Sequence, residues 1–293
     1  MNVPIAKFNT ISDIPLIAYG TWVDDFTDTS TMLTRVKQAL ELGYTHIDTA
    51  KNYGTEPYVI QAINESNIPR YTIFVTSKIR SIMDIGTLSM SLGPLQYYDL
   101  LLLHYPPLRT DSRSLFKQRI LPLWIGMEQY LRAGITKAIG VSNFYQNHLD
   151  LLLEVCNENG LTFPMVNQIE IHIGNLELDY VPYMQDRGII PFAHTPLGGL
   201  GAQYILNNEI LTKIGERIGA TPAQVVLAYL LKRKIGIVTS SKNPIHMHES
   251  IHVAKFIPSL TTEDMNDINS TDMGMGPIIE GSQYSWDDNS RLY

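Results

Sequence analysis

Eight short apolar segments, each followed by a stretch with helical periodicity, constrain the fold of this chain more than any other feature of its sequence. Most are nearly continuous apolar runs, such as Leu100-Leu101-Leu102-Leu103. Such runs are typical of the strands of a parallel sheet, because those strands are buried on both faces. We therefore predict strands at residues 14–22, 44–50, 73–79, 98–105, 138–144, 165–171, 189–194 and 236–241.

The segments between these strands have the pattern of amphipathic helices. Residues 30–42 place apolar side chains on one side and stop at Gly43, and residues 121–133 repeat the pattern and stop at Gly134. Thr221-Pro222 is a helix start, with an N-cap residue followed by proline in the first turn. Eight such units in 293 residues favour an α/β fold of the (β/α)₈ TIM-barrel type, a parallel eight-stranded closed barrel.

An open, doubly wound sheet is the competing fold. It would be expected to carry a G-x-G-x-x-G motif after its first strand, and the residues that follow Trp22 contain no such glycines. We therefore predict one barrel domain over residues 1–293, within which residues 274–293 form a C-terminal tail. Two large aromatic residues in that tail, Tyr284 and Trp286, favour a tail that folds back over the barrel mouth.

Composition excludes several classes of protein. No apolar run approaches the roughly 18 residues of a membrane span, and the N-terminus lacks a basic and then apolar leader. Cys156 is the only cysteine, so no disulfide is expected. The net charge of −7 is spread without a basic block, which argues against nucleic acid and anionic membranes as partners. We expect a cytoplasmic protein that exists as a monomer or a weak homodimer.

Four polar side chains gather at one end of three neighbouring strands. Asp48 ends the second predicted strand, with Tyr53 five positions later, and Lys78 and His104 end the third and fourth. Taken singly, each has an ordinary interpretation as an N-cap, a half-buried aromatic, a solvated strand end or a structural histidine. Active sites of such barrels lie where the strands end, so the set together favours a catalytic site.

The types of these residues indicate proton transfer to an oxygen. Tyrosine has a pKa near 10, and a lysine ammonium beside it lowers that pKa by stabilising the phenolate. Asp48 would hold Lys78 charged, and His104 would orient a carbonyl oxygen beside Tyr53. No side chain can supply the hydride that completes a reduction, whereas a nicotinamide can.

Three motifs on these segments resemble the aldo-keto reductase family. They are Gly43-Tyr44-Thr45-His46-Ile47-Asp48-Thr49-Ala50, Leu103-His104-Tyr105-Pro106 and Ile139-Gly140-Val141-Ser142-Asn143-Phe144. The resemblance covers essentially the whole chain. Thr239-Ser240-Ser241-Lys242 and the chain length are similar to fungal ketoamide and conjugated-polyketone reductases of the 2-dehydropantolactone type.

The resemblance implies roles for particular residues. Asp48, Tyr53, Lys78 and His104 match the catalytic tetrad of the family. The matches to residues that bind the nicotinamide end of the cofactor are Ser142, Asn143, Gln168, His194, Thr195 and Leu197. The matches to the substrate pocket are Trp22, His104, Tyr105 and, in the tail, Trp286.

The chain departs from the family pattern at two places. His194 stands where a tyrosine normally stacks on the nicotinamide, so we expect a weaker grip on the cofactor. Ser240 and His246 stand where a lysine and an arginine usually hold the adenosine 2′-phosphate. Lys242, with Ser241 and the start of the following helix, would substitute for them. We expect NADP(H) as cofactor, with NAD(H) as the less favoured choice.

The leading hypothesis is therefore an NADPH-dependent oxidoreductase that reduces small-molecule aldehydes, ketones or activated dicarbonyls. Two alternatives stay open, namely an NADH-preferring sugar or steroid reductase and a cofactor-binding barrel that acts as a sensing or regulatory subunit. His246, His248 and His252 resemble a metal cluster only superficially, because no carboxylate or cysteine completes the set, and we predict no metal site.

Overall fold

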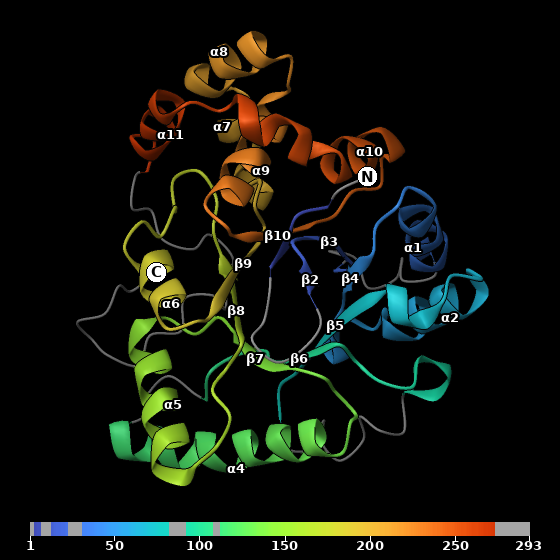
Figure 1. The fold of residues 1–293 in the computed structure, drawn as a ribbon, viewed down its shortest axis with the longest axis vertical. Coiled ribbons are helices and arrows are strands. Elements are labelled where there is room, and N and C mark those ends of the chain that lie inside the picture. Colours follow the sequence, from blue (N-terminus) through green and yellow to red (C-terminus); the bar gives the residue numbers. More distant parts are fainter. Residues whose placement is uncertain (1–2, 7–12, 23–30, 82–91, 108–111, 273–293) are drawn as a thin grey trace.

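Eight parallel strands close into a barrel in the computed structural model, which describes residues 3–6, 13–22, 31–81, 92–107 and 112–272 (Figure 1). Their order around the barrel is β10-β3-β4-β5-β6-β7-β8-β9, so chain neighbours are also neighbours in space. The strands are β3 (Ile17–Gly20), β4 (His46–Asp48), β5 (Phe74–Ile79), β6 (Leu100–Leu103), β7 (Ile139–Ser142), β8 (Val166–Glu170), β9 (Ile190–His194) and β10 (Gly236–Thr239). The predicted fold class is confirmed, and each of the eight predicted segments contains one barrel strand.

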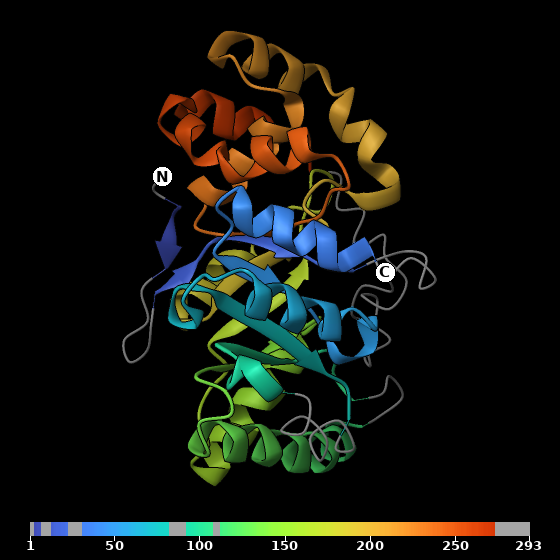
Figure 2. The same cartoon turned by 90° about the vertical axis from the view of Figure 1, so that its right-hand side faces the viewer.

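Helices cover the outside of the barrel (Figures 1 and 2). The α-helices are α1 (Met32–Glu41), α2 (Glu56–Glu65), α4 (Arg113–Arg132), α5 (Gln146–Asn159), α6 (Tyr180–Asp186), α7 (Ala202–Leu206), α8 (Glu209–Ile218), α9 (Pro222–Lys232), α10 (Pro244–Ile251) and α11 (Thr262–Asn269). Short 3₁₀ turns add η2 (Lys51–Tyr53), η3 (Arg70–Thr72), η4 (Gly93–Leu95), η5 (Gly199–Gly201) and η6 (Val253–Ser259). Within the described ranges, no helix has both the length and the apolar character needed to cross a membrane.

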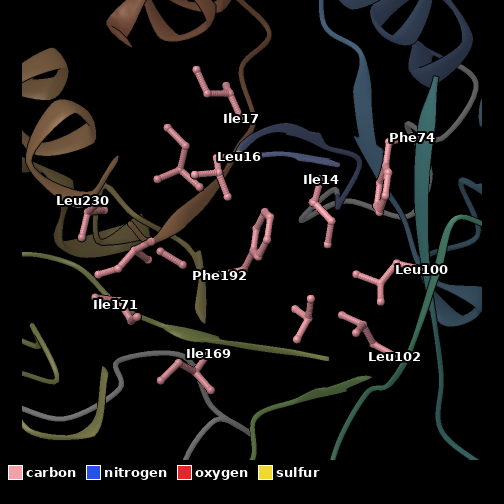
Figure 3. Close-up of a cluster of buried hydrophobic side chains, with 14 of the residues drawn as sticks. Ile14, Leu16, Ile17, Phe74, Leu100, Leu102, Ile169, Ile171, Phe192 and Leu230 are labelled. Atoms are coloured by element: carbon pink, nitrogen blue, oxygen red, sulfur yellow. The ribbon is translucent and has the colours of Figure 1, made fainter. Parts of the chain in front are cut away.

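Side chains fill the interior of the barrel. Figure 3 shows the ring of Phe192 of β9 in the interior of the barrel, with Leu100 and Leu102 of β6 across the interior from it. Phe192 fits because β10 has Gly236 beside it, where an added Cβ would lie 2.3 Å from the ring. The interior is thus a packed core that supports the polar groups at the strand ends.

The start of the barrel differs from the prediction of one strand over residues 14–22. Ile14 and Pro15 form β2, which pairs antiparallel with β1 (Ile5–Ala6), and the chain bends at Leu16 before β3 begins. Proline has no N–H to donate to a strand ladder, which favours a strand edge at this position. The predicted strand is therefore two strands in two different sheets.

Helix α4 also differs from the prediction, which began it at residue 121. The helix starts at Arg113, and the Ser112 hydroxyl caps it by accepting from the Leu115 backbone N–H at 3.3 Å. It continues through Pro122, one residue after the predicted start. By contrast, the predicted start at Thr221 is confirmed as a capping box with Gln224. The predicted tail at 274–293, including Trp286, lies outside the described residues.

Candidate active site

The four predicted catalytic residues come together at the carboxyl end of the barrel. Asp48 is the last residue of β4, Lys78 lies in β5 and His104 directly follows β6. Side chains alternate along a strand, so Phe74, Thr76 and Lys78 lie on the same face of β5. The apolar Phe74 is at the amino end of this face, and the charged Lys78 is at its carboxyl end. Tyr53 reaches the same place because the short turn η2 follows β4 and ends at this residue.

A buried ion pair stands at the centre of the site. Lys78 Nζ donates to Asp48 Oδ1 at 2.5 Å, to the Thr49 carbonyl at 3.1 Å and to the Tyr53 hydroxyl at 3.2 Å. Lys78 is only 1% exposed. Burial alone would lower the pKa of Lys78, but the negative charge of Asp48 and the contact with Tyr53 outweigh burial and raise it. Lys78 therefore keeps its positive charge inside the barrel.

The pKa of Tyr53 corrects one expectation from the sequence. Burial raises it above its ordinary value of 10.0, and the Lys78 ammonium opposes this increase without reversing it. The phenol thus retains its proton near neutral pH, as a proton donor must. The ammonium at 3.2 Å would then stabilise the phenolate that forms when the proton leaves.

His104 is held by side chains on three sides. Its ring stacks on Tyr105 with centroids 4.6 Å apart and meets the ring of Tyr53 edge to face at 5.7 Å. Its Nδ1 lies 3.0 Å from Oδ1 of Asn52, a residue that was not among the predicted site residues. The available signal was an amide side chain directly before Tyr53. Burial, Lys78, Arg80 and His194 hold the pKa of His104 well below 6.5, so the imidazole is neutral.

Gln168 connects the predicted nicotinamide end of the site to the ion pair. Its Nε2 donates to Asp48 Oδ2 at 2.8 Å. A carboxylate can only accept, so this bond fixes the orientation of the amide and turns Oε1 away from Asp48. Within the described residues, Gln168 Oε1 has no hydrogen-bond partner. An acceptor placed beside the ion pair would fit the carboxamide N–H of a nicotinamide.

Ser142, Asn143 and His194 form the wall next to Gln168. The Ser142 hydroxyl donates to the Gln168 carbonyl at 2.8 Å, and Asn143 Nδ2 donates to the His104 carbonyl at 3.0 Å. His194 Nε2 lies 3.0 Å from Asn143 Oδ1. Burial is the main cause that lowers the pKa of His194 to about 4, so it is neutral and donates this bond.

Asn143 of this wall and Thr195, which directly follows His194, have a backbone conformation that L-amino acids with side chains disfavour. Asn143 has φ 61° and Thr195 has φ 54°. A positive φ is costly for a β-branched residue such as threonine, and strain of this kind concentrates at functional sites. Leu197, the other predicted cofactor contact of this loop, is half-buried two residues later.

The predicted phosphate end lies around the start of α10, just after β10. Ser240, Lys242 and His246 are exposed there. Ser241 Oγ accepts from the Asn243 N–H at 3.0 Å, and Asn243 Nδ2 lies 3.4 Å from His246 Nε2. His248 and His252 lie on the same helix with ring centroids 4.0 Å apart. Across the described ranges, no group of three metal-ligating side chains is present.

Trp22 and Tyr105 lie at the rim of the site. Trp22 is 45% exposed and contacts the ring of Tyr53 edge to face, with centroids 5.0 Å apart. Arg80 lies over the Tyr105 ring at 4.8 Å. Both aromatic residues are therefore next to the proposed proton donor or its histidine, where a substrate would contact them. Trp286, the third predicted pocket aromatic, is outside the described residues.

A parallel eight-stranded barrel whose carboxyl end holds a charged lysine 3.2 Å from a tyrosine hydroxyl has the architecture of a barrel enzyme, with a site suited to proton donation by a phenol. The model of the aldo/keto reductase family matches residues 16–272, so the chain belongs to this family.

Relatives with known names agree with this assignment. The chain is 33% identical to glycerol 2-dehydrogenase (NADP(+)) of Saccharomyces cerevisiae, over 91% of this chain and 90% of the relative. It is 31% identical to D-galacturonate reductase of Hypocrea jecorina, over 90% and 88%. Among solved structures, an aldo-keto reductase of the silkworm Bombyx mori aligns with a TM-score of 0.83 and 32% identity, over 95% of this chain and 90% of that one. That enzyme has also been solved in complex with NADPH.

Proposed function

We propose that this protein reduces aldehyde or ketone groups to alcohols with NADPH, and that Tyr53 donates the proton. The observation that carries the proposal is the position of the Lys78 ammonium, 3.2 Å from the Tyr53 hydroxyl and 2.5 Å from Asp48. A tyrosine beside a buried, positively charged lysine can release a proton to an oxygen that gains negative charge.

Each residue of the site has a separate task in this mechanism. Tyr53 gives its proton to the carbonyl oxygen, and Lys78 stabilises the phenolate left behind. Asp48 keeps Lys78 charged and directs its Nζ toward the phenol. The nicotinamide supplies the hydride when it is bound, and Ser142, Gln168 and the surrounding wall present hydrogen-bonding groups that would hold its carboxamide.

We propose NADPH rather than NADH as the preferred cofactor. The silkworm relative was solved with NADPH, and the yeast relative is named for NADP(+). In this chain the exposed Ser240, Lys242 and His246 at the start of α10, together with the half-buried Ser241, would bind the 2′-phosphate. A cation near a helix N-terminus attracts a phosphate through charge and through backbone N–H groups.

We further propose that the physiological substrate is an activated dicarbonyl of the ketoamide or conjugated-polyketone type. The support is the similarity of Thr239-Ser240-Ser241-Lys242 to the fungal reductases that act on such compounds. We also propose that residues 1–293 act as one domain in the cytoplasm, as a monomer or a weak homodimer.

A cofactor-oxidation screen tests the proposed function. Purified protein is mixed with NADPH or NADH and with aldehydes, α-keto lactones, diketones and pentoses. We expect oxidation of NADPH by activated carbonyls and a loss of at least about 100-fold in kcat/KM for Tyr53→Phe, because the general acid is removed. Tyr71→Phe, at a tyrosine that is 80% exposed and remote from the site, is the matched control. Activity retained by Tyr53→Phe would refute the mechanism. If the protein oxidises neither NADPH nor NADH with any of these compounds, a sensing or regulatory barrel would be favoured.

A further inference from the structure

Arg80 is a cation at the rim of the site that has no role in the proton transfer proposed above. It directly follows β5, two residues after Lys78, and its side chain is exposed. Ile79 pairs with Leu103 in the barrel, and the His104 N–H donates to the Ile79 carbonyl at 2.8 Å. Arg80 and His104 therefore leave two adjacent strands at the same level of the barrel mouth.

Three ring contacts connect Arg80 to the proton donor. Its guanidinium lies over the ring of Tyr105, with Cζ 4.8 Å from the ring centroid. The Tyr105 ring stacks on His104 at 4.6 Å, and the His104 ring meets that of Tyr53 edge to face at 5.7 Å. A small molecule bound along this row of side chains would meet the phenol at one end and the guanidinium at the other.

The two cations of the site differ in their capacity to bind a substrate. A lysine ammonium has three N–H groups, and Lys78 uses them on Asp48, on a backbone carbonyl and on the Tyr53 hydroxyl. The guanidinium of Arg80 has five N–H groups, which allow it to hold more than one partner at once. Its contact with the aromatic ring depends on its charge and not on these groups. Arg80 is therefore better suited than Lys78 to bind an anionic group of a substrate.

The charge of Arg80 is also felt inside the site. Burial is the largest cause that holds the pKa of His104 well below 6.5, and the positive charges of Lys78 and Arg80 lower it further. His104 lies beside the place proposed for the reacting carbonyl. A substrate in that place would thus experience the field of Arg80.

We propose that Arg80 binds a carboxylate of the substrate, and that the protein therefore prefers carbonyl compounds that carry such a group at a distance from the reacting carbonyl. This proposal rests on the proposed function, because it places the reacting carbonyl beside Tyr53. A guanidinium suits the task, since its planar fork of N–H groups matches the two oxygens of a carboxylate. The carboxylate is additional to the reacting group, so the preferred class includes activated dicarbonyls that carry an acid.

Two benzaldehydes of similar shape test the preference. 4-Carboxybenzaldehyde is an anion at pH 7, and methyl 4-formylbenzoate is its uncharged ester. The ratio of their kcat/KM values with NADPH, acid over ester, is compared between variants, so that their different chemical reactivities cancel. In Arg80→Gln we expect this ratio to fall about tenfold, mainly through a higher KM for the acid, because a charge-assisted hydrogen bond is lost. Arg80→Lys should retain part of the ratio, since it keeps the charge without the fork.

Arg132→Gln is the matched control. Arg132 lies in the last turn of α4, shortly before β7 begins, and its side chain is 70% exposed. It therefore removes the same charge near the amino end of the barrel, and its ratio should equal that of the unaltered protein. An unchanged ratio in Arg80→Gln would overturn the proposal. An equal loss of kcat/KM for acid and ester would also overturn it, because Arg80 would then only support the rim.

A binding measurement separates this inference from the proposed function. Isothermal titration calorimetry with 4-(hydroxymethyl)benzoate and its methyl ester, the products of the two reductions, requires no turnover. We expect Arg80→Gln to raise the Kd of the acid about tenfold relative to that of the ester. If neither aldehyde is reduced but this shift in Kd is found, carbonyl reduction fails and the carboxylate site at Arg80 stands. If both aldehydes are reduced and Arg80→Gln changes neither the kinetic ratio nor the relative Kd, carbonyl reduction stands and the role of Arg80 fails.

Discussion

Two lysine–carboxylate pairs in this protein have the same length but different surroundings. Lys78 and Asp48 lie 2.5 Å apart with side chains that are 1% and 3% exposed, and Lys37 and Glu65 lie 2.5 Å apart with 39% and 40% exposure. An exposed pair contributes little to stability because water screens it. A buried pair is different, because removal of one charge leaves the other without compensation.

The first prediction compares these pairs. Asp48→Asn should lower the free energy of unfolding by about 3–5 kcal/mol, because it leaves the Lys78 ammonium buried without its counter-charge. Glu65→Gln should change it by less than about 1 kcal/mol. Urea denaturation monitored by circular dichroism measures both. Similar losses in the two variants would show that burial does not govern the strength of these pairs.

At the scale of residues, the sequence was sufficient to select the four catalytic candidates, because three of them stand at the ends of strands and Tyr53 follows one of these ends by five residues. It was not sufficient to predict the pKa of Tyr53, since the extent of burial depends on side chains from distant segments. Nor could it show that Gln168 bonds to Asp48, because 120 residues separate them in the chain. Asn52 was missed for the same reason, since its partner His104 lies on another strand.

At the scale of elements, the strands were predictable because burial on both faces makes most of them rich in apolar residues. The start of α4 was not, because the apolar pattern was recognised only from residue 121 although α4 begins at Arg113 and continues through Pro122. Proline has no N–H for the carbonyl four residues earlier, and it is usually excluded from helix interiors. The preceding turns and the packing of Phe116 and Ile120 in the core hold this helix together despite Pro122.

A substitution at this proline tests that account. Pro122 is exposed, so Pro122→Ala should restore one helical hydrogen bond without changing the core. The gain in helix propensity is about 3 kcal/mol, and greater freedom of the unfolded chain offsets up to about 1 kcal/mol, so the free energy of unfolding should increase by about 2 kcal/mol. Pro222→Ala in the first turn of α9, where proline is tolerated, should give no increase. Equal effects at both positions in chemical denaturation would contradict this explanation.

At the scale of the whole molecule, buried neutral histidines make stability depend on pH. His148 is 1% exposed and stacks on Phe116, and burial lowers its pKa to about 3. Its pKa in the unfolded chain is near 6.5. Above pH 6.5 the histidine is neutral in both states and has no effect. Below that value the unfolded chain binds a proton that the folded protein does not, so stability is lost as pH falls toward 3.

The corresponding experiment measures the free energy of unfolding between pH 7 and pH 5. We expect a plateau near pH 7 and a decline below pH 6.5, to which His148 contributes up to about 1.4 kcal/mol per pH unit. His148→Phe keeps an aromatic ring next to Phe116 and Phe144 and should make the decline shallower by that amount. Parallel curves for the two proteins would mean that His148 is protonated in the folded state.

The bond between Gln168 and Asp48 has a consequence for how such an enzyme can evolve. The amide proposed to hold the nicotinamide also supports the catalytic ion pair, so a mutation there would disturb coenzyme binding and proton transfer together. Ser240, Lys242 and His246 are exposed around α10, and natural selection or a designer can vary them at little cost to the barrel. We therefore expect coenzyme preference to change readily between lineages. The residues proposed to carry out the reaction should change much less, because they are buried in the barrel and bonded to one another.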